Sequence, residues 1–190
     1  MRMLLAIGLL SAMPVMASAV EVEYTFGGTI DSGVLAPIPG VGVLQSGAEF
    51  EVKLRFDTEA SDMFPDTPSI GWYTTGLATV NVDGLPQLSG TMEMFVEAFT
   101  AEPAFFVFGP FDQGDPLFFQ VIVPLPGKAL PSDAPPLTLP FEQSIDPFIM
   151  FQNEPDQRGT ITSFSSQVIP APAASLLLLG AGLRRRRRRP

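Results

Sequence analysis

Short stretches of the chain alternate between apolar and polar residues. The clearest of them begin at Val20, Phe50, Ala78 and Met92, and in each one every second residue is apolar. A period of two is typical of β-strands that bury one face and expose the other. The pattern therefore predicts four strands that pack against a common core.

Two further stretches, 104–108 and 117–123, are almost continuously apolar. Runs of this kind favour strands that are covered on both faces. Ranges 148–151 and 160–168 are weaker strand candidates. Glycine and proline separate the candidates, as at Gly109-Pro110, and such residues end strands and form turns.

Away from the two ends of the chain, no stretch has a convincing helical period. Short strands at close spacing with frequent turn residues are typical of antiparallel all-β domains. We therefore expect one all-β domain over residues 20–167, built as an antiparallel β-sandwich or a jelly roll.

The N-terminal residues, 1–19, have the features of a secretory signal peptide. Arg2 supplies a positive charge, an apolar run covers 3–10, and Ala17 and Ala19 are the small residues that signal peptidase requires. We expect cleavage after Ala19, which makes Val20 the first residue of the mature protein. An uncleaved membrane anchor is the alternative, but the apolar run is too short to cross a bilayer.

The C-terminal residues, 168–190, form a second signal with three parts. A proline-containing motif comes first, an apolar run over 174–183 follows, and a basic end closes the chain. The motif consists of Ile169, Pro170, Ala171, Pro172 and Ala173. The basic end consists of Arg184, Arg185, Arg186, Arg187, Arg188 and Arg189.

The length of this tail suits temporary retention in a membrane. A helix over 173–183 covers about 16 Å, whereas the hydrocarbon core of a bilayer is about 30 Å thick. The prolines break any extension of that helix toward the N-terminus. Because positive charge stays where translocation starts, we expect the arginines to remain on the cytoplasmic side of the inner membrane.

The tail resembles a PEP-CTERM sorting domain, in which a Pro-Glu-Pro motif precedes an apolar helix and an arginine-rich end. The resemblance rests on Pro170, Pro172, Ala173 and the arginine run, and it covers only the last residues of the chain. It implies a Gram-negative bacterium, processing by an exosortase-type membrane protease, and a link to exopolysaccharide and biofilm. Ala171 stands where the usual motif has glutamate, and the apolar run is shorter than usual. A plain tail anchor with a basic stop is the alternative.

Composition excludes several kinds of chemistry. The chain contains neither cysteine nor histidine. Disulfides, thiolate clusters, structural zinc sites and the serine–histidine and cysteine–histidine machineries are therefore absent. Residues 20–169 carry four basic residues against twenty acidic ones, a net charge of −16. Such a body repels nucleic acid, so we expect no nucleic-acid partner.

Acidic residues offer three candidate sites. The pairs Glu21/Glu23 and Glu49/Glu51 lie about 6.6 Å apart along a strand, within the range of glycosidase carboxylates, but the alternation places them on a solvated face. Glu93 and Glu97 are too far apart for paired acid–base work, at about 13 Å. Together with Phe95, which lies between them, they form an aromatic strip with carboxylates that suits either a sugar ring or ordinary packing.

The third candidate is the loop 57–66, whose acidic residues suit calcium. Its possible ligands are Asp57, Glu59, Asp62 and Asp66, although they match no EF-hand spacing. The alternative is that these are ordinary turn residues without a metal. No other cofactor is expected.

The single tryptophan, Trp72, is the last residue that suggests a ligand. We expect it in the core, with a sugar-binding surface position as the alternative. Taken together, the two signals predict an exported, non-enzymatic bacterial surface or matrix protein. A carbohydrate-binding domain in an exopolysaccharide matrix is the alternative, and a hydrolase that uses acidic residues has only the abundance of carboxylates in its favour.

Overall fold

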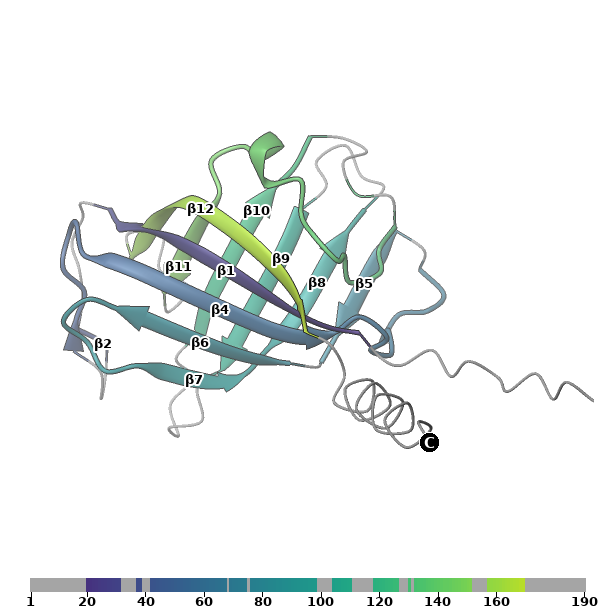
Figure 1. Ribbon diagram of the computed structural model, residues 1–190, viewed down its shortest axis with the longest axis horizontal. Coiled ribbons are helices and arrows are strands. Elements are labelled where there is room, and N and C mark those ends of the chain that lie inside the picture. Colours follow the sequence, from purple (N-terminus) through teal and green to yellow (C-terminus); the bar gives the residue numbers. More distant parts are fainter. Residues whose placement is uncertain are drawn as a thin grey trace, which may run out of the picture.

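The computed structural model describes residues 20–31, 37–38, 42–67, 69–74, 76–98, 104–110, 118–126, 130, 132–151 and 157–169 (Figure 1). Within these ranges the protein is almost entirely antiparallel β-sheet, which confirms the all-β prediction. The strands are β1 (Glu21–Ile30), β2 (Pro37–Ile38), β3 (Gly42–Val43), β4 (Glu49–Asp57), β5 (Ile70–Tyr73), β6 (Leu77–Val82), β7 (Leu88–Thr91), β8 (Glu93–Glu97), β9 (Ala104–Pro110), β10 (Phe118–Pro124), β11 (Phe148–Phe151) and β12 (Arg158–Ile169).

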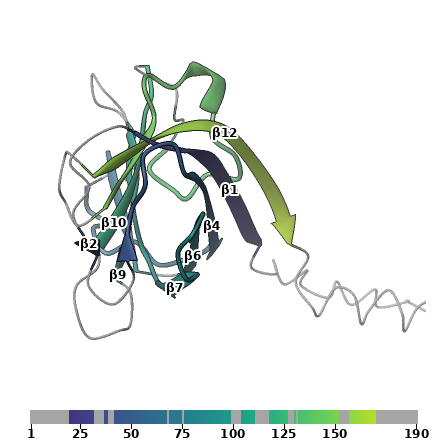
Figure 2. The ribbon, with the colours of Figure 1, turned by 90° about the vertical axis from the view of Figure 1, so that its left-hand side faces the viewer.

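Ten of these strands form one sheet in the order β5-β8-β9-β10-β11-β12-β1-β4-β6-β7, and β2 pairs with β3 separately. The sheet curls so that its two halves face each other across the core, as the two views show (Figures 1 and 2). The halves face each other as layers do in a sandwich, yet they belong to one continuous sheet. β12 makes this possible because it pairs with β11 over Arg158–Thr160 only, and with β1 from Gly159 to Ile169.

The curled sheet is joined again on its other side. β7 pairs with β6 in one half, and β8 pairs with β9 in the other half. Only Met92 separates β7 from β8, and its side chain is buried. A single stretch of chain, 88–97, therefore passes from one half of the sheet to the other.

The core lies between the two halves and contains the residues that the alternation predicted to be buried. Val22, Tyr24 and Phe26 of β1 are completely buried, while their neighbours in sequence are partly exposed. The same alternation holds along β4, β6 and β8. Tyr24 is central, with ring centroids 5.0 Å from Phe56 and 5.7 Å from Phe105. Edge-to-face packing of this kind adds to the stabilisation from burial.

A bulge in β12, in which Thr162 is the extra residue, lies opposite Gly27 and Gly28 of β1. The register between β1 and β12 shifts between Gly27 and Gly28. A Cβ atom on Gly28 would lie 2.0 Å from the carbonyl oxygen of Thr160, so only glycine fits this position. The close approach of the two backbones explains why glycine stands at this position.

An irregular segment, residues 130 and 132–147, covers one end of the core; we call it the strap. It contains the short 3-10 helix η1 (Phe141–Gln143). The hydroxyl of Tyr24 donates to the carbonyl of Pro136, and that of Tyr73 donates to the carbonyl of Asp133. Leu130 and Leu139 of the strap are buried in the core.

Three elements differ from the sequence-based expectations. β12 continues to Ile169 and so passes the expected domain boundary at 167. The short strands β5 and β7 had no period-two signal long enough to predict them. The pairing of Ile169 with Glu21 shows that β12 reaches Ile169.

Candidate functional site

The two ends of the folded body meet at one point. β1 begins at Glu21, next to the expected signal-peptidase site, and β12 ends at Ile169, next to Pro170. Glu21 and Ile169 are register partners in the β1–β12 ladder. The start of β1 and the end of β12 therefore lie side by side (Figure 2).

This junction is held by several polar contacts. The carbonyl oxygen of Val20 accepts hydrogen bonds from the backbone N–H of Thr58 at 3.0 Å and from its hydroxyl at 3.1 Å. Arg55 Nε and Nη2 donate to the two carboxylate oxygens of Glu21 at 2.6 and 2.5 Å. These hydrogen bonds hold the pKa of Glu21 below its usual range, against the smaller opposing effect of burial.

Most residues of the two predicted signals lie outside the described residues. This group includes Ala17, Ala19, the motif residues 170–173 and the arginine run 184–189. Only Val20 and Ile169 are described. The two signals therefore stay predictions. Among the described residues there is no helix of the length and apolarity that a membrane span requires.

Trp72 does not lie in the core, contrary to the expectation. In β5 the inward side chain is that of Tyr73, which is 4% exposed, whereas Trp72 points to the outer face and is partly exposed. Its ring lies 5.7 Å from that of Phe64 and 6.1 Å from that of Phe95, centroid to centroid. The indole N–H has no hydrogen-bond partner within the described part of the chain.

These three rings, Phe64, Trp72 and Phe95, form what we call the aromatic patch. Glu93 and Glu97 project from β8 on the same face as Phe95, because residues two apart in a strand share a face. Phe64 is 45% exposed, so the patch is open to solvent on that side. An exposed aromatic surface beside carboxylates suits the apolar face and the hydroxyl groups of a sugar.

The loop 57–66, expected as a possible calcium site, uses its carboxylates in another way. Asp62 Oδ1 accepts the backbone N–H groups of Phe64 and Trp72, both at 2.9 Å. Asp57 Oδ1 accepts the N–H of Glu59 at 2.8 Å. The described residues include no group of three or more acidic side chains placed to hold one metal ion. The calcium hypothesis for Asp57, Glu59, Asp62 and Asp66 has no support from this geometry and stays a prediction.

The carboxylate pairs of β1 and β4 lie where the alternation placed them, on the outer face. Two basic residues of β4, Lys53 and Arg55, form ion pairs with these carboxylates. Arg55 reaches across to Glu21 on β1, whereas Lys53 pairs with Glu51 on its own strand at 3.0 Å. Exposed pairs of this kind contribute little to stability because solvent screens them, so they are surface features of the sheet.

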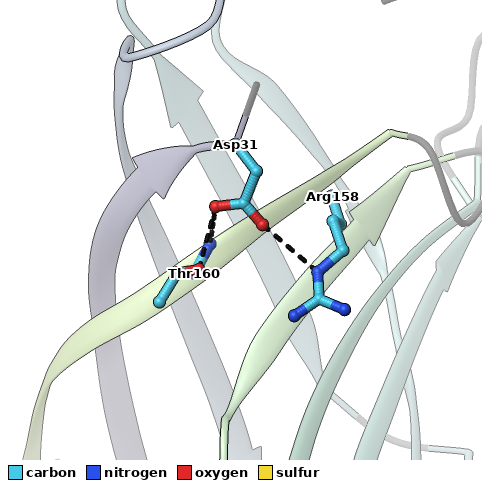
Figure 3. A network of polar contacts seen from close by, with 3 residues as sticks. All are labelled: Asp31, Arg158 and Thr160. Atoms are coloured by element: carbon cyan, nitrogen blue, oxygen red, sulfur yellow. Dashed lines mark hydrogen bonds and ion pairs between the residues drawn. The ribbon is translucent and has the colours of Figure 1, made fainter. Parts of the chain in front are cut away.

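One polar network was not foreseen from the sequence. Asp31, just after β1, accepts hydrogen bonds from Arg158 Nε at 3.2 Å and from the hydroxyl of Thr160 at 2.8 Å (Figure 3). The guanidinium carbon of Arg158 also lies 4.7 Å above the centre of the Phe148 ring. The network ties the end of β1 to the start of β12. No local signal could have found it, because its members are far apart in the sequence.

An open groove of about 450 Å³ lies over the bulge of β12 and the facing glycines of β1. Its polar lining consists of hydroxyl and carboxylate side chains from three strands, namely Thr25, Thr29, Glu49, Glu51, Thr162, Ser163 and Ser165. Groups of this kind can hydrogen-bond a polar ligand.

Comparison with known proteins yields no match to a family, to a curated protein or to a solved structure.

Proposed function

We propose that residues 20–169 are the exported body of a PEP-CTERM-like precursor, a non-enzymatic surface or matrix protein of a Gram-negative bacterium. Signal peptidase removes residues 1–19. The tail from Pro170 then retains the body at the inner membrane until an exosortase-type protease cuts within the motif. As a finer assignment, we include the body among jelly-roll-like sandwiches, in view of the two facing halves of its sheet.

The observation that carries the proposal is the pairing of Glu21 with Ile169. Both expected cleavage points directly flank this pair. The described core runs from Val22 to Ile161, so cleavage at either end would remove no core residue. The residue before a proline favours an extended backbone, which is the form that proteases bind, and this supports a cut at the motif.

Truncation after Ile169 tests the role of the tail. We expect the full chain to pass through the inner-membrane fraction of a host that has an exosortase, and the truncated chain to appear directly as a soluble exported protein. Equal thermal midpoints for the two processed bodies would show that the tail contributes nothing to folding. An unchanged distribution of the truncated chain between membrane and soluble fractions would contradict the proposal.

Carbohydrate binding by the aromatic patch is the second candidate function, and the outward position of Trp72 favours it. Trp72→Ala is expected to reduce retention of the exported body on an extracted exopolysaccharide matrix about fivefold or more, since stacking on a large ring contributes on the order of 1 kcal/mol or more. Leu77→Ala is the matched control, because Leu77 is 59% exposed on the other half of the sheet. Equal retention of the two variants would exclude the patch as a sugar site.

A further inference from the structure

The aromatic patch lies at one end of an apolar row that crosses the outer face of one half of the sheet. One residue from each of five neighbouring strands belongs to this row, in continuous register: Trp72, Phe95, Phe106, Ile122 and Phe148. Trp72, Phe95 and Phe148 are partly exposed. The row runs across β5, β8, β9, β10 and β11, which lie side by side in Figure 1. At about 4.8 Å between strands it spans about 19 Å, which is long enough for several sugar rings in a line.

At the Phe148 end of the row, a cation of the protein itself lies over the ring. The guanidinium carbon of Arg158 is 4.7 Å from the centre of the Phe148 ring. Arg158 Nε also lies 3.2 Å from the Asp31 carboxylate (Figure 3). A cation within about 6 Å of a ring centre is attracted by the electron-rich face of the ring. On this outer face, a ring and a carboxylate together therefore hold a cation.

At the other end of the row, the aromatic patch combines rings with carboxylates in the same way. Glu93 and Glu97 stand on either side of Phe95, each about 6.6 Å away along β8, and both are partly exposed. Within the described part of the chain, every basic side chain pairs with a different carboxylate, in the pairs Lys53–Glu51, Arg55–Glu21 and Arg158–Asp31. Neither Glu93 nor Glu97 therefore has a basic partner among the described residues.

We propose that the aromatic patch, together with Glu93 and Glu97, binds a cationic glycan, namely a polymer of amino sugars whose amino groups are free and protonated. The proposal rests on the second candidate function, sugar binding by the patch, and adds the class of sugar. The apolar face of a sugar ring stacks on Trp72 or Phe95, and the ammonium group of the sugar meets a glutamate.

Charge complementarity favours this ligand over other polymers. Residues 20–169 carry a net charge of −16, which attracts a polycation and repels glycans that carry carboxylates. An amino-sugar polymer presents a flat ring face and a positive charge in every unit, which matches a ring with a carboxylate on each side. A lysine-rich peptide supplies the charge without the flat face.

Calorimetric titration of the full chain, kept in a nonionic polyoxyethylene detergent, tests the proposal. The probes are a glucosamine tetramer with free amino groups, its fully N-acetylated form and tetralysine, at a mildly acidic pH that keeps the amino groups protonated. We expect the free-amine tetramer to bind about fivefold to tenfold more tightly than the acetylated one, because an exposed ion pair and a cation–π contact each contribute a small factor. Tetralysine should bind more weakly than the free-amine tetramer.

Two double variants separate the site from the overall charge of the protein. Glu93→Gln with Glu97→Gln should remove the preference for the free-amine tetramer and leave binding of the acetylated tetramer unchanged. Glu23→Gln with Glu49→Gln is the matched control on the outer face of β1 and β4, because it removes the same charge and should keep the preference. Trp72→Ala should weaken binding of both tetramers.

The outcomes distinguish the amino-sugar inference from the sugar function on which it rests. Equal affinities of the wild type for the two tetramers would overturn the inference and keep the patch as a sugar site. Absence of binding to both tetramers, or binding that Trp72→Ala leaves unchanged, would overturn the sugar function as well. The inference is also wrong if the preference persists without Glu93 and Glu97, if the control variant loses it, or if tetralysine binds as tightly as the free-amine tetramer.

Discussion

At the scale of single residues, two tyrosine hydroxyls fasten the strap to the sheet. Tyr24 and Tyr73 are the two tyrosines of the chain, and both donate to strap carbonyls. Burial raises the pKa of the Tyr24 hydroxyl well above its usual range. Burial also raises the pKa of Tyr73 to about 12, with a further contribution from the negative charges of Asp62 and Asp133.

These raised pKa values predict a loss of stability in alkali. The unfolded chain has tyrosine pKa values of about 10, so it releases protons before the folded protein does. Stability is then complete below about pH 10 and falls as the pH rises toward 12, with Tyr73 accounting for about 1 kcal/mol at about pH 11. Urea unfolding of the wild type and of Tyr73→Phe over this range measures the effect. As the pH rises, Tyr73→Phe should lose less free energy of unfolding than the wild type. Parallel curves of stability against pH for the two proteins would show that Tyr73 does not titrate in this way.

The Asp62 carboxylate caps the β5 edge of the sheet by accepting the backbone N–H of Trp72. Since it accepts two backbone N–H groups, Asp62→Ala should reduce the free energy of unfolding by about 1–3 kcal/mol. Asp66→Ala is the control, because Asp66 is exposed. Thermal melting with calcium and with a chelator completes the test. The loss of stability caused by Asp62→Ala should be the same with calcium and with chelator. A loss seen only with calcium would favour the metal hypothesis.

At the scale of elements, the bulge of β12 at Thr162 requires a close approach to Gly28 of β1. Gly28→Ala should destabilise the protein by about 3 kcal/mol, because the new methyl group would meet the Thr160 backbone and the Phe50 ring. Gly27→Ala is a matched control next to it, where the close neighbour is the hydroxyl of Ser163, which can rotate away. Equal unfolding midpoints for the two variants would show that the bulge tolerates a side chain.

The strands that the sequence predicted well are those whose alternation is long. In β1 and β4 every second residue is apolar over the whole strand, so the inward face follows directly from the pattern. β5 is different because Trp72 and Tyr73 are adjacent aromatic residues in a strand of four. Which of them faces the core depends on the pairing of β5 with β8, a contact that a local pattern does not contain.

Site residues divide in the same way, into those that a local pattern reveals and those that depend on long-range contacts. The sequence placed the outer carboxylates of β1 and β4 correctly, because a solvated face needs no long-range information. It did not reveal that Asp62 would accept the backbone N–H of Trp72, nor that Asp31 would meet Arg158. Both contacts join segments that come together only when the sheet curls.

At the scale of the whole molecule, the body begins and ends at one paired position, Glu21 with Ile169. A domain built in this way can lose its leader and its tail without losing core contacts.

The most direct measurement of the central claim is the intact mass of the mature protein from an exosortase-containing host. We predict a body that begins at Val20 and ends within the motif 170–173, and a longer product when Pro170 and Pro172 are both replaced by alanine. A wild-type mature protein that retains its arginine run would contradict the account.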